Sequence, residues 1–168
     1  MASPLAAHWT LDPAVRFLNH GSFGATPRAV LEEQSRWRAR MEREPVLFLG
    51  REIGAELDLA REQLAAFLGA RSADMVFVPN ATTGVSAVLR SLELAPGDEL
   101  LTTSHAYNAC RNALEFAARA RGATLRTAPL PFPIEGPAAV VERVLGACTP
   151  RTRLCLLDHV TSPTGQCN

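Results

Sequence analysis

The stretch MVFVPNATTGVSAVLRSL, residues 75–92, decides the fold. Its first four residues, 75–78, form an apolar run too short for a helix, which predicts a buried strand that Pro79 ends. Residues 85–92 carry Val and Leu at i, i+3, i+4 and i+7, the spacing of one helical face. The predicted order is therefore a strand, a short polar loop (NATTG, 80–84) and the N-terminus of a helix.

The polar loop allows two interpretations. The free N–H groups at a helix N-terminus, the positive end of the helix dipole and the Thr hydroxyls can together bind an anion such as phosphate. Asn and Thr are also ordinary N-caps, so the loop could serve only to cap the helix. The sequence contains neither the GxxxxGK motif of a P-loop nor the GxGxxG motif of a dinucleotide-binding fold. The loop alone leaves both interpretations open.

Composition restricts the class of protein. A chain of 168 residues with 47% apolar and 20% charged residues is typical of one globular domain with its own core. The formal net charge is zero, so no nucleic-acid or membrane partner is expected. All 17 basic residues are Arg, and the chain contains no Lys. Apart from the N-terminus, it therefore has no amine that could form a Schiff base.

Cysteine usage and the N-terminus indicate the compartment. The four cysteines show no CxxC spacing and are expected to be thiols in a reducing compartment, rather than disulfide partners or zinc ligands. The N-terminus lacks the basic start and apolar run of a secretory signal, and no stretch has the length of a membrane span. A cytoplasmic location is therefore expected, with no metal site.

The rest of the chain alternates between predicted helices and strands. Residues 1–16 are expected to be a loose lead-in, and residues 46–50 an apolar connector. Helices are predicted at 27–44, 51–68, 108–120 and from 137 onward, and strands at 99–103, 124–128 and, buried, at 153–157. Strands that alternate with helices of this length predict an α/β fold with a mostly parallel, doubly wound sheet.

Polar clusters follow three of the predicted strands, at residues 80–84, 105–108 and 158–165. The carboxyl ends of parallel strands meet at one edge of a sheet, where ligands bind in open α/β folds. The three clusters are therefore expected to converge and form a pocket. For His105 and Tyr107, core packing or a turn remains an equal alternative. The NHGSFG segment, residues 19–24, could approach a ligand because of its glycines, or form a surface turn.

Four motifs taken together resemble a known family. They are NHGSFGATP at 19–27, FVPNATTGVSAVLRSL at 77–92, PGDELLTTSHAYNACRNAL at 96–114 and DHVTSPTG at 158–165. In this order and spacing they are similar to the class V aminotransferase family, a fold-type I group of enzymes that use pyridoxal 5′-phosphate (PLP). Within that family the likeness is greatest to the isopenicillin N epimerase-like members, which are related to the cysteine desulfurases.

The resemblance implies a cofactor site. Ala81, Thr82 and Thr83 match the loop that holds the PLP phosphate. Tyr107 matches the aromatic residue or His that stacks on the pyridine ring, with His105 as the second choice. These residues would give the chain the fold of the PLP-binding large domain.

Further positions follow from the same resemblance. Ser162 replaces an Asn of relatives in the SPTG turn, and its hydroxyl is expected to reach the cofactor's ring oxygen. Asn19 and His20 match the segment that lines the substrate end of the site. Asp158 does not receive the role of the pyridinium partner, because in the family that Asp comes later, in a motif resembling DGAH.

Other parts of the family pattern do not occur in this sequence. The Schiff-base Lys, the DGAH-like motif and the small C-terminal domain are missing, so no catalytic residue is assigned. The resemblance implies an N-terminal segment, 1–26, followed by the N-terminal part of the large domain, 27–168, with an incomplete sheet that favours aggregation.

Two functions are expected from these observations. The first is a portion of a PLP-dependent enzyme, in the family a homodimer, that acts on a small amino acid as an epimerase, a C–S lyase or desulfurase, or a transaminase. The alternative is a non-catalytic relative that binds a phosphate ligand or a full-length partner subunit.

Overall fold

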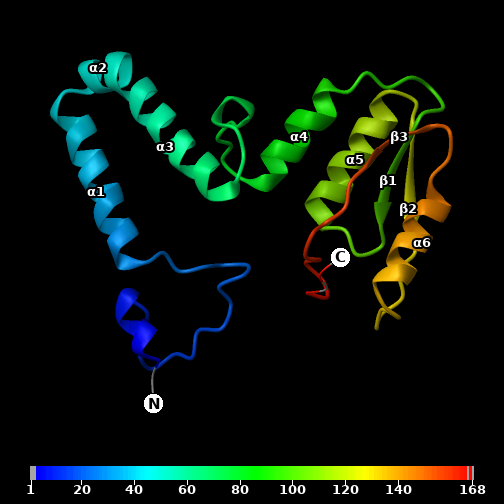
Figure 1. Cartoon of the computed structure of the whole chain (residues 1–168), viewed down its shortest axis with the longest axis horizontal. Coiled ribbons are helices and arrows are strands. Elements are labelled where there is room, and N and C mark those ends of the chain that lie inside the picture. Colours follow the sequence, from blue (N-terminus) through cyan, green and yellow to red (C-terminus); the bar gives the residue numbers. More distant parts are fainter. Residues whose placement is uncertain (1–2, 166, 168) are drawn as a thin grey trace. The chain divides into compact units, whose positions relative to one another are not determined.

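The computed structural model describes residues 3–165 and residue 167. The chain divides into two compact units, Met1–Val76 and Phe77–Asn168. The first unit is helical and the second contains the sheet (Figure 1). The predicted boundary between residues 26 and 27 remains a prediction.

The first unit consists of short and long helices, and the non-helical residues 9–27 separate the first of them from the second. They are a 3-10 helix at Pro4–His8, α1 at Arg28–Arg43, α2 at Pro45–Leu47, a π-helical segment at Phe48–Glu52, α3 at Ile53–Leu68 and a 3-10 turn at Ser72–Asp74. The prediction of an apolar connector at 46–50 is wrong, because these residues are helical. Pro45 ends α1 but also begins the next helix, since proline is well tolerated in a first turn. Gly69 ends α3 in the left-handed conformation, which glycine adopts readily, so the predicted end of this helix at residue 68 is confirmed.

Arg40 connects two of these helices. Its guanidinium donates to Glu52 at 2.8 Å and to Glu56 at 2.7 Å. It also lies over the rings of Trp37 and Phe48, 5.1 and 5.5 Å from their centroids. Arg40 therefore stabilises the packing of α1 against the start of α3.

The second unit is an α/β layer structure (Figure 1). Its elements are α4 (Ala81–Ser91), β1 (Glu99–Thr103), α5 (Asn108–Ala120), β2 (Thr124–Ala128), α6 (Pro137–Ala147) and β3 (Thr152–Cys155). The strands are parallel and lie in the order β2-β1-β3. The α/β class and the parallel sheet are thereby confirmed, and β1 and β2 have the predicted bounds.

The core lies on both faces of β1 because successive residues of a strand point to opposite sides. Leu100 packs with Leu89 of α4 and Leu114 of α5. Leu101 packs on the other face with Ala128 and with Val144 of α6. The sheet is therefore covered by α4 and α5 on one side and by α6 on the other, which is the doubly wound arrangement.

Two strand predictions differ from the structure. Residues 75–78 form no strand, and Val76 and Phe77 are 80% and 52% exposed. Apolar residues favour a strand only where a neighbouring strand supplies hydrogen bonds, and no strand in the described part of the chain pairs with this run. The last strand is shorter than predicted and half exposed rather than buried, because β3 lies at one edge of the three-stranded sheet.

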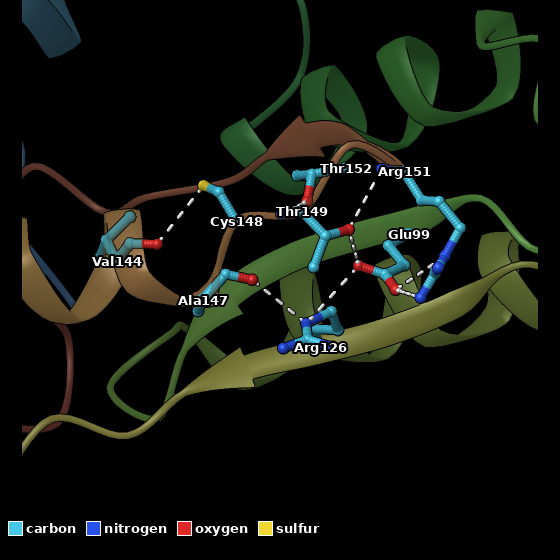
Figure 2. Close-up of polar contacts among 8 residues, drawn as sticks. All are labelled: Glu99, Arg126, Val144, Ala147, Cys148, Thr149, Arg151 and Thr152. Atoms are coloured by element: carbon cyan, nitrogen blue, oxygen red, sulfur yellow. Dashed lines mark hydrogen bonds and ion pairs between the residues drawn. The ribbon is translucent and has the colours of Figure 1, made fainter.

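The buried carboxylate of Glu99 forms hydrogen bonds and ion pairs at the amino end of the sheet (Figure 2). Glu99, only 4% exposed, accepts from the Arg151 guanidinium at 2.6 Å and from the Thr149 hydroxyl at 2.7 Å. Arg126 of β2 lies 3.6 Å from the same carboxylate. The Thr149 hydrogen bond, followed by Arg151, lowers the pKa of Glu99. This network ties β1 to β2 and to the turn before β3, at the end of the sheet opposite to the polar clusters.

Candidate functional site

The N-terminus of α4 carries unused hydrogen-bond donors. Asn80 is the N-cap, and its Oδ1 accepts from the Thr83 N–H at 2.9 Å and from the Thr83 hydroxyl at 3.1 Å. The N–H groups of Ala81 and Thr82 donate to no group among the described residues. The first turn contains no acidic side chain. The helix dipole and these two N–H groups therefore favour an anion, while both donors of Thr83 are engaged by the cap.

The second cluster lies where β1 ends. His105 is 8% exposed, and its Nδ1 has no hydrogen-bond partner in the described part of the chain. Its ring lies edge-on to Phe132, with centroids 6.4 Å apart. Tyr107 is the N-cap of α5 and is 47% exposed. The Tyr107 ring is therefore open to a ligand, whereas His105 offers a buried nitrogen.

The third cluster follows β3. Asp158 is half-buried, and its Oδ2 accepts the backbone N–H of Tyr107 at 2.7 Å. Beyond it the chain turns, with the Gly165 N–H donating to the Thr161 carbonyl at 2.8 Å. Thr161 is buried and Ser162 is exposed, so the Ser162 hydroxyl is accessible from solvent.

The thiol of Cys110 marks the place where the three clusters meet. Burial raises the pKa of this thiol, and the Asp158 carboxylate raises it further, while a hydrogen bond with the Thr82 side chain lowers it. Asp158 in turn accepts from Tyr107. The three clusters therefore lie together at the carboxyl edge of the sheet, as predicted, whereas the pocket expected from them remains a prediction. Sequence analysis assigned Cys110 no role in the site. Its position one turn after Tyr107 indicates that it lies under the site.

Asn19 and His20 belong to the first unit. Asn19 Oδ1 accepts the Ser22 N–H at 3.3 Å, and the His20 ring lies 4.7 Å from the Phe17 ring and 5.9 Å from that of Trp9. A Cβ at Gly24 would lie 2.8 Å from the His20 carbonyl oxygen, so this position requires glycine. The predicted loose lead-in, residues 1–16, contains a 3-10 helix at Pro4–His8, and the Trp9 indole N–H donates to the Ala25 carbonyl at 3.0 Å. The roles predicted for Asn19 and His20 remain predictions.

The described part of the chain contains neither a cluster of metal ligands nor a membrane-spanning helix. No group of three or more His, Cys, Asp or Glu side chains is placed to hold a metal ion. The helices of residues 3–165 include none that is long and apolar enough to cross a membrane. The cysteines described there and at residue 167 are free thiols.

The fold and site together define an α/β protein in which a helix N-terminus with two unpaired N–H groups among the described residues lies beside an accessible aromatic ring. Residues 24–168 match the family model of the aminotransferase class-V proteins. The chain therefore belongs to the aminotransferase class-V family.

Relatives and solved structures extend this result. The chain is 43% identical over 159 residues to an isopenicillin N epimerase of Amycolatopsis lactamdurans, covering 93% of this chain and 40% of that enzyme. It is 31% identical over 166 residues to a putative L-cysteine desulfhydrase of Oryza sativa subsp. japonica, covering 90% and 35%. A structure of the C–S lyase C-DES with glycine covalently linked to its PLP cofactor matches with a TM-score of 0.73 and 25% identity, covering 86% of this chain and 38% of that one.

Proposed function

We propose that this chain supplies the phosphate-binding part of a PLP-dependent enzyme that acts on an amino acid. The observation that carries the proposal is the N-terminus of α4, where the N–H groups of Ala81 and Thr82 point to no partner in the described chain, next to Tyr107 and Asp158. Membership of the class-V family and the PLP-linked structural neighbour support the choice of PLP as the anion.

The residues at this edge fit the parts of PLP. The phosphate would accept hydrogen bonds from the N–H groups of Ala81 and Thr82 and from the Thr82 hydroxyl. Thr83 would not take part, because its N–H and hydroxyl both donate to Asn80 Oδ1. The ring would stack on Tyr107, whose side chain is open, with the buried His105 as the second choice. Ser162, exposed in its turn, would donate to the ring oxygen.

PLP, when bound, acts as an electron sink that weakens the bonds at the α-carbon of an attached amino acid. The residues of this chain hold and orient it: the α4 N-terminus fixes one end, and Tyr107 fixes the plane of the ring. The chain itself contains no Lys that could bind the cofactor covalently. Asn19 and His20 are proposed to line the substrate end.

The substrate class follows from the relatives. Their names point to isopenicillin N, L-cysteine and, in a C-DES structure, cystine. Because cysteine and cystine are small amino acids, a small amino acid is the proposed substrate, with epimerase, C–S lyase or desulfurase, and transaminase as the reaction types to be distinguished. A homodimer and a cytoplasmic location complete the proposal.

The proposal is tested with pyridoxamine 5′-phosphate, the amine form of the cofactor, which cannot form a Schiff base with the N-terminus. Isothermal titration calorimetry should show binding that Thr82→Val weakens by about tenfold, as expected for a lost hydrogen bond to a charged group. Thr124→Val on β2 is the matched control, since the same change there should leave the affinity unchanged. No binding by the wild-type chain, or equal affinities of wild type and Thr82→Val, would contradict the proposal.

The alternative function is separated by a second ligand. A non-catalytic chain that binds only a phosphate group would take inorganic phosphate as tightly as pyridoxamine 5′-phosphate, because the ring would add nothing. The proposed site should prefer pyridoxamine 5′-phosphate. The reaction type is then tested on the native protein, by following racemisation, sulfide release and amino-group transfer with amino-acid substrates.

A further inference from the structure

One hydrogen bond joins the ends of two neighbouring strands. The backbone N–H of Tyr107, just after β1, donates to Asp158 Oδ2, just after β3, over 2.7 Å and across 51 positions of sequence. The acceptor is a carboxylate, which makes this short contact stronger than a bond between neutral groups. Asp158 is half-buried, so water competes for it less than for an exposed carboxylate.

The same bond completes the start of α5. Tyr107 is the N-cap of this helix, and its own carbonyl accepts from the Arg111 N–H at 3.0 Å. No side chain caps α5, and its first turn contains no acidic residue. Asp158 therefore supplies, from a distant part of the sequence, the negative charge that a helix N-terminus favours.

The bond lies at a particular point of the fold, where the winding direction of the sheet changes. From β1 the chain passes through α5 to β2 on one side, while β3 lies on the other side of β1 and follows α6 on the opposite face. The carboxyl ends of β1 and β3 thus flank the point where the winding direction changes, which is where open α/β sheets bind ligands. Tyr107 and Asp158 face each other across that point.

The rest of the loop that carries Tyr107 is fixed from the opposite side. The Ser104 N–H donates to the Ala128 carbonyl and the Leu130 N–H donates to the Ser104 hydroxyl, both at 2.9 Å. The Ala106 N–H donates to the Thr103 carbonyl at 3.2 Å. The β2 side therefore holds the beginning of the loop, and Asp158 holds its end, at the residue whose ring is 47% exposed.

We infer that Asp158 is a positioning residue, which sets the place of the Tyr107 ring against the cofactor ring through the Tyr107 backbone. The inference rests on the proposed function. This role of Asp158 differs from that of a purely structural cap. Loss of a structural cap would lower the stability of α5, but it would not change the binding of a ligand that has a ring differently from the binding of a ligand that lacks one.

The test compares two ligands and two substitutions. Asp158→Ala removes the acceptor, whereas Asp158→Asn keeps an oxygen that can accept the Tyr107 N–H. Asp158→Ala should bind pyridoxamine 5′-phosphate about tenfold more weakly, the effect of one hydrogen bond to a charged group. Inorganic phosphate should bind Asp158→Ala at least as tightly as wild type, because a nearby negative charge is gone. Asp158→Asn should restore most of the affinity for pyridoxamine 5′-phosphate.

A double substitution identifies Tyr107 as the group through which Asp158 acts. Tyr107→Ala should weaken pyridoxamine 5′-phosphate binding as Asp158→Ala does, and combining the two should add little further loss. Independent, additive losses would mean that Asp158 does not act through Tyr107 and would overturn the inference.

Hydrogen–deuterium exchange reports on the bond without any ligand. The Tyr107 amide should exchange about tenfold or more faster in Asp158→Ala than in wild type, and near the wild-type rate in Asp158→Asn. Unchanged exchange in Asp158→Ala, or equal loss of both ligands, would overturn the inference. If wild type binds neither ligand, the proposed function fails and the cofactor part of this inference fails with it, whereas the exchange rates still decide whether Asp158 holds Tyr107.

Discussion

Asn80 separates the two tasks of the α4 N-terminus, because one substitution can remove the cap and another can keep the cap while repelling an anion. In the structure one amide oxygen, Asn80 Oδ1, accepts from both the N–H and the hydroxyl of Thr83, at 2.9 and 3.1 Å. Asn80→Ala removes this acceptor. Asn80→Asp retains an acceptor and adds a negative charge directly before the two free N–H groups.

The size of each effect follows from the exposure of the site. Asn80 and Thr83 are both exposed, so each of the two hydrogen bonds should contribute an energy at the low end of the range for protein hydrogen bonds. Asn80→Ala should therefore lower the free energy of unfolding by about 1 kcal/mol. Asn80→Asp should keep or slightly raise stability, because Asp caps helices well and suits the helix dipole. Urea unfolding followed by circular dichroism, with linear extrapolation, measures both differences.

Binding should respond in the opposite way for the aspartate variant. Two unit charges about 4 Å apart near a protein surface interact by about 1–4 kcal/mol, so Asn80→Asp should lose at least about tenfold in affinity for pyridoxamine 5′-phosphate. Asn80→Ala should lose much less, since it leaves the N–H groups of Ala81 and Thr82 in place. An Asn80→Asp variant as stable as wild type that also binds pyridoxamine 5′-phosphate equally well would refute the phosphate assignment and leave plain capping.

Three further predictions concern the scaffold. Because the pKa of Glu99 is lowered in the folded state, the ionised Glu99 side chain contributes its full stabilisation above its ordinary pKa of 4.5, and this stabilisation is lost as the pH falls through the folded-state pKa. Glu99→Gln should therefore lower the urea midpoint at neutral pH and make that midpoint depend less on pH in the acid range. Leu114→Ala, in the core and 0% exposed, should lower the free energy of unfolding by about 2–5 kcal/mol, whereas Leu145→Ala, at 65% exposure, should change it by less than about 0.5 kcal/mol. Iodoacetamide should modify the exposed Cys148 before the buried Cys110, whose pKa is raised by burial, and peptide mass spectrometry would contradict this by finding equal rates.

The sequence predicted the elements whose patterns are local. The strands at Glu99–Thr103 and Thr124–Ala128 are bounded by turn residues, and both have the predicted bounds. The helix at Ala81–Ser91 follows from its apolar spacing and its Asn cap. Parallel strands joined by helices then bring the polar clusters to one edge, which is why the site could be predicted before its contacts were known.

Features that depend on a partner were not predicted. The apolar run at 75–78 has the composition of a strand, but no strand in the described part of the chain pairs with it, and Val76 is 80% exposed. The hydrogen bond between Asp158 and Tyr107 joins residues 51 positions apart, so no local sequence pattern predicts it. The engagement of both Thr83 donors by Asn80 is likewise a matter of geometry, since the NATTG loop allows either threonine to face an anion.

The most direct test of the central claim is an amide-resolved NMR titration of the chain with pyridoxamine 5′-phosphate. The largest chemical-shift changes should fall on the amides of Ala81 and Thr82 and on Tyr107, and inorganic phosphate should reproduce only the changes at Ala81 and Thr82. Changes located elsewhere, or none at saturating ligand, would contradict a cofactor phosphate site at the N-terminus of α4.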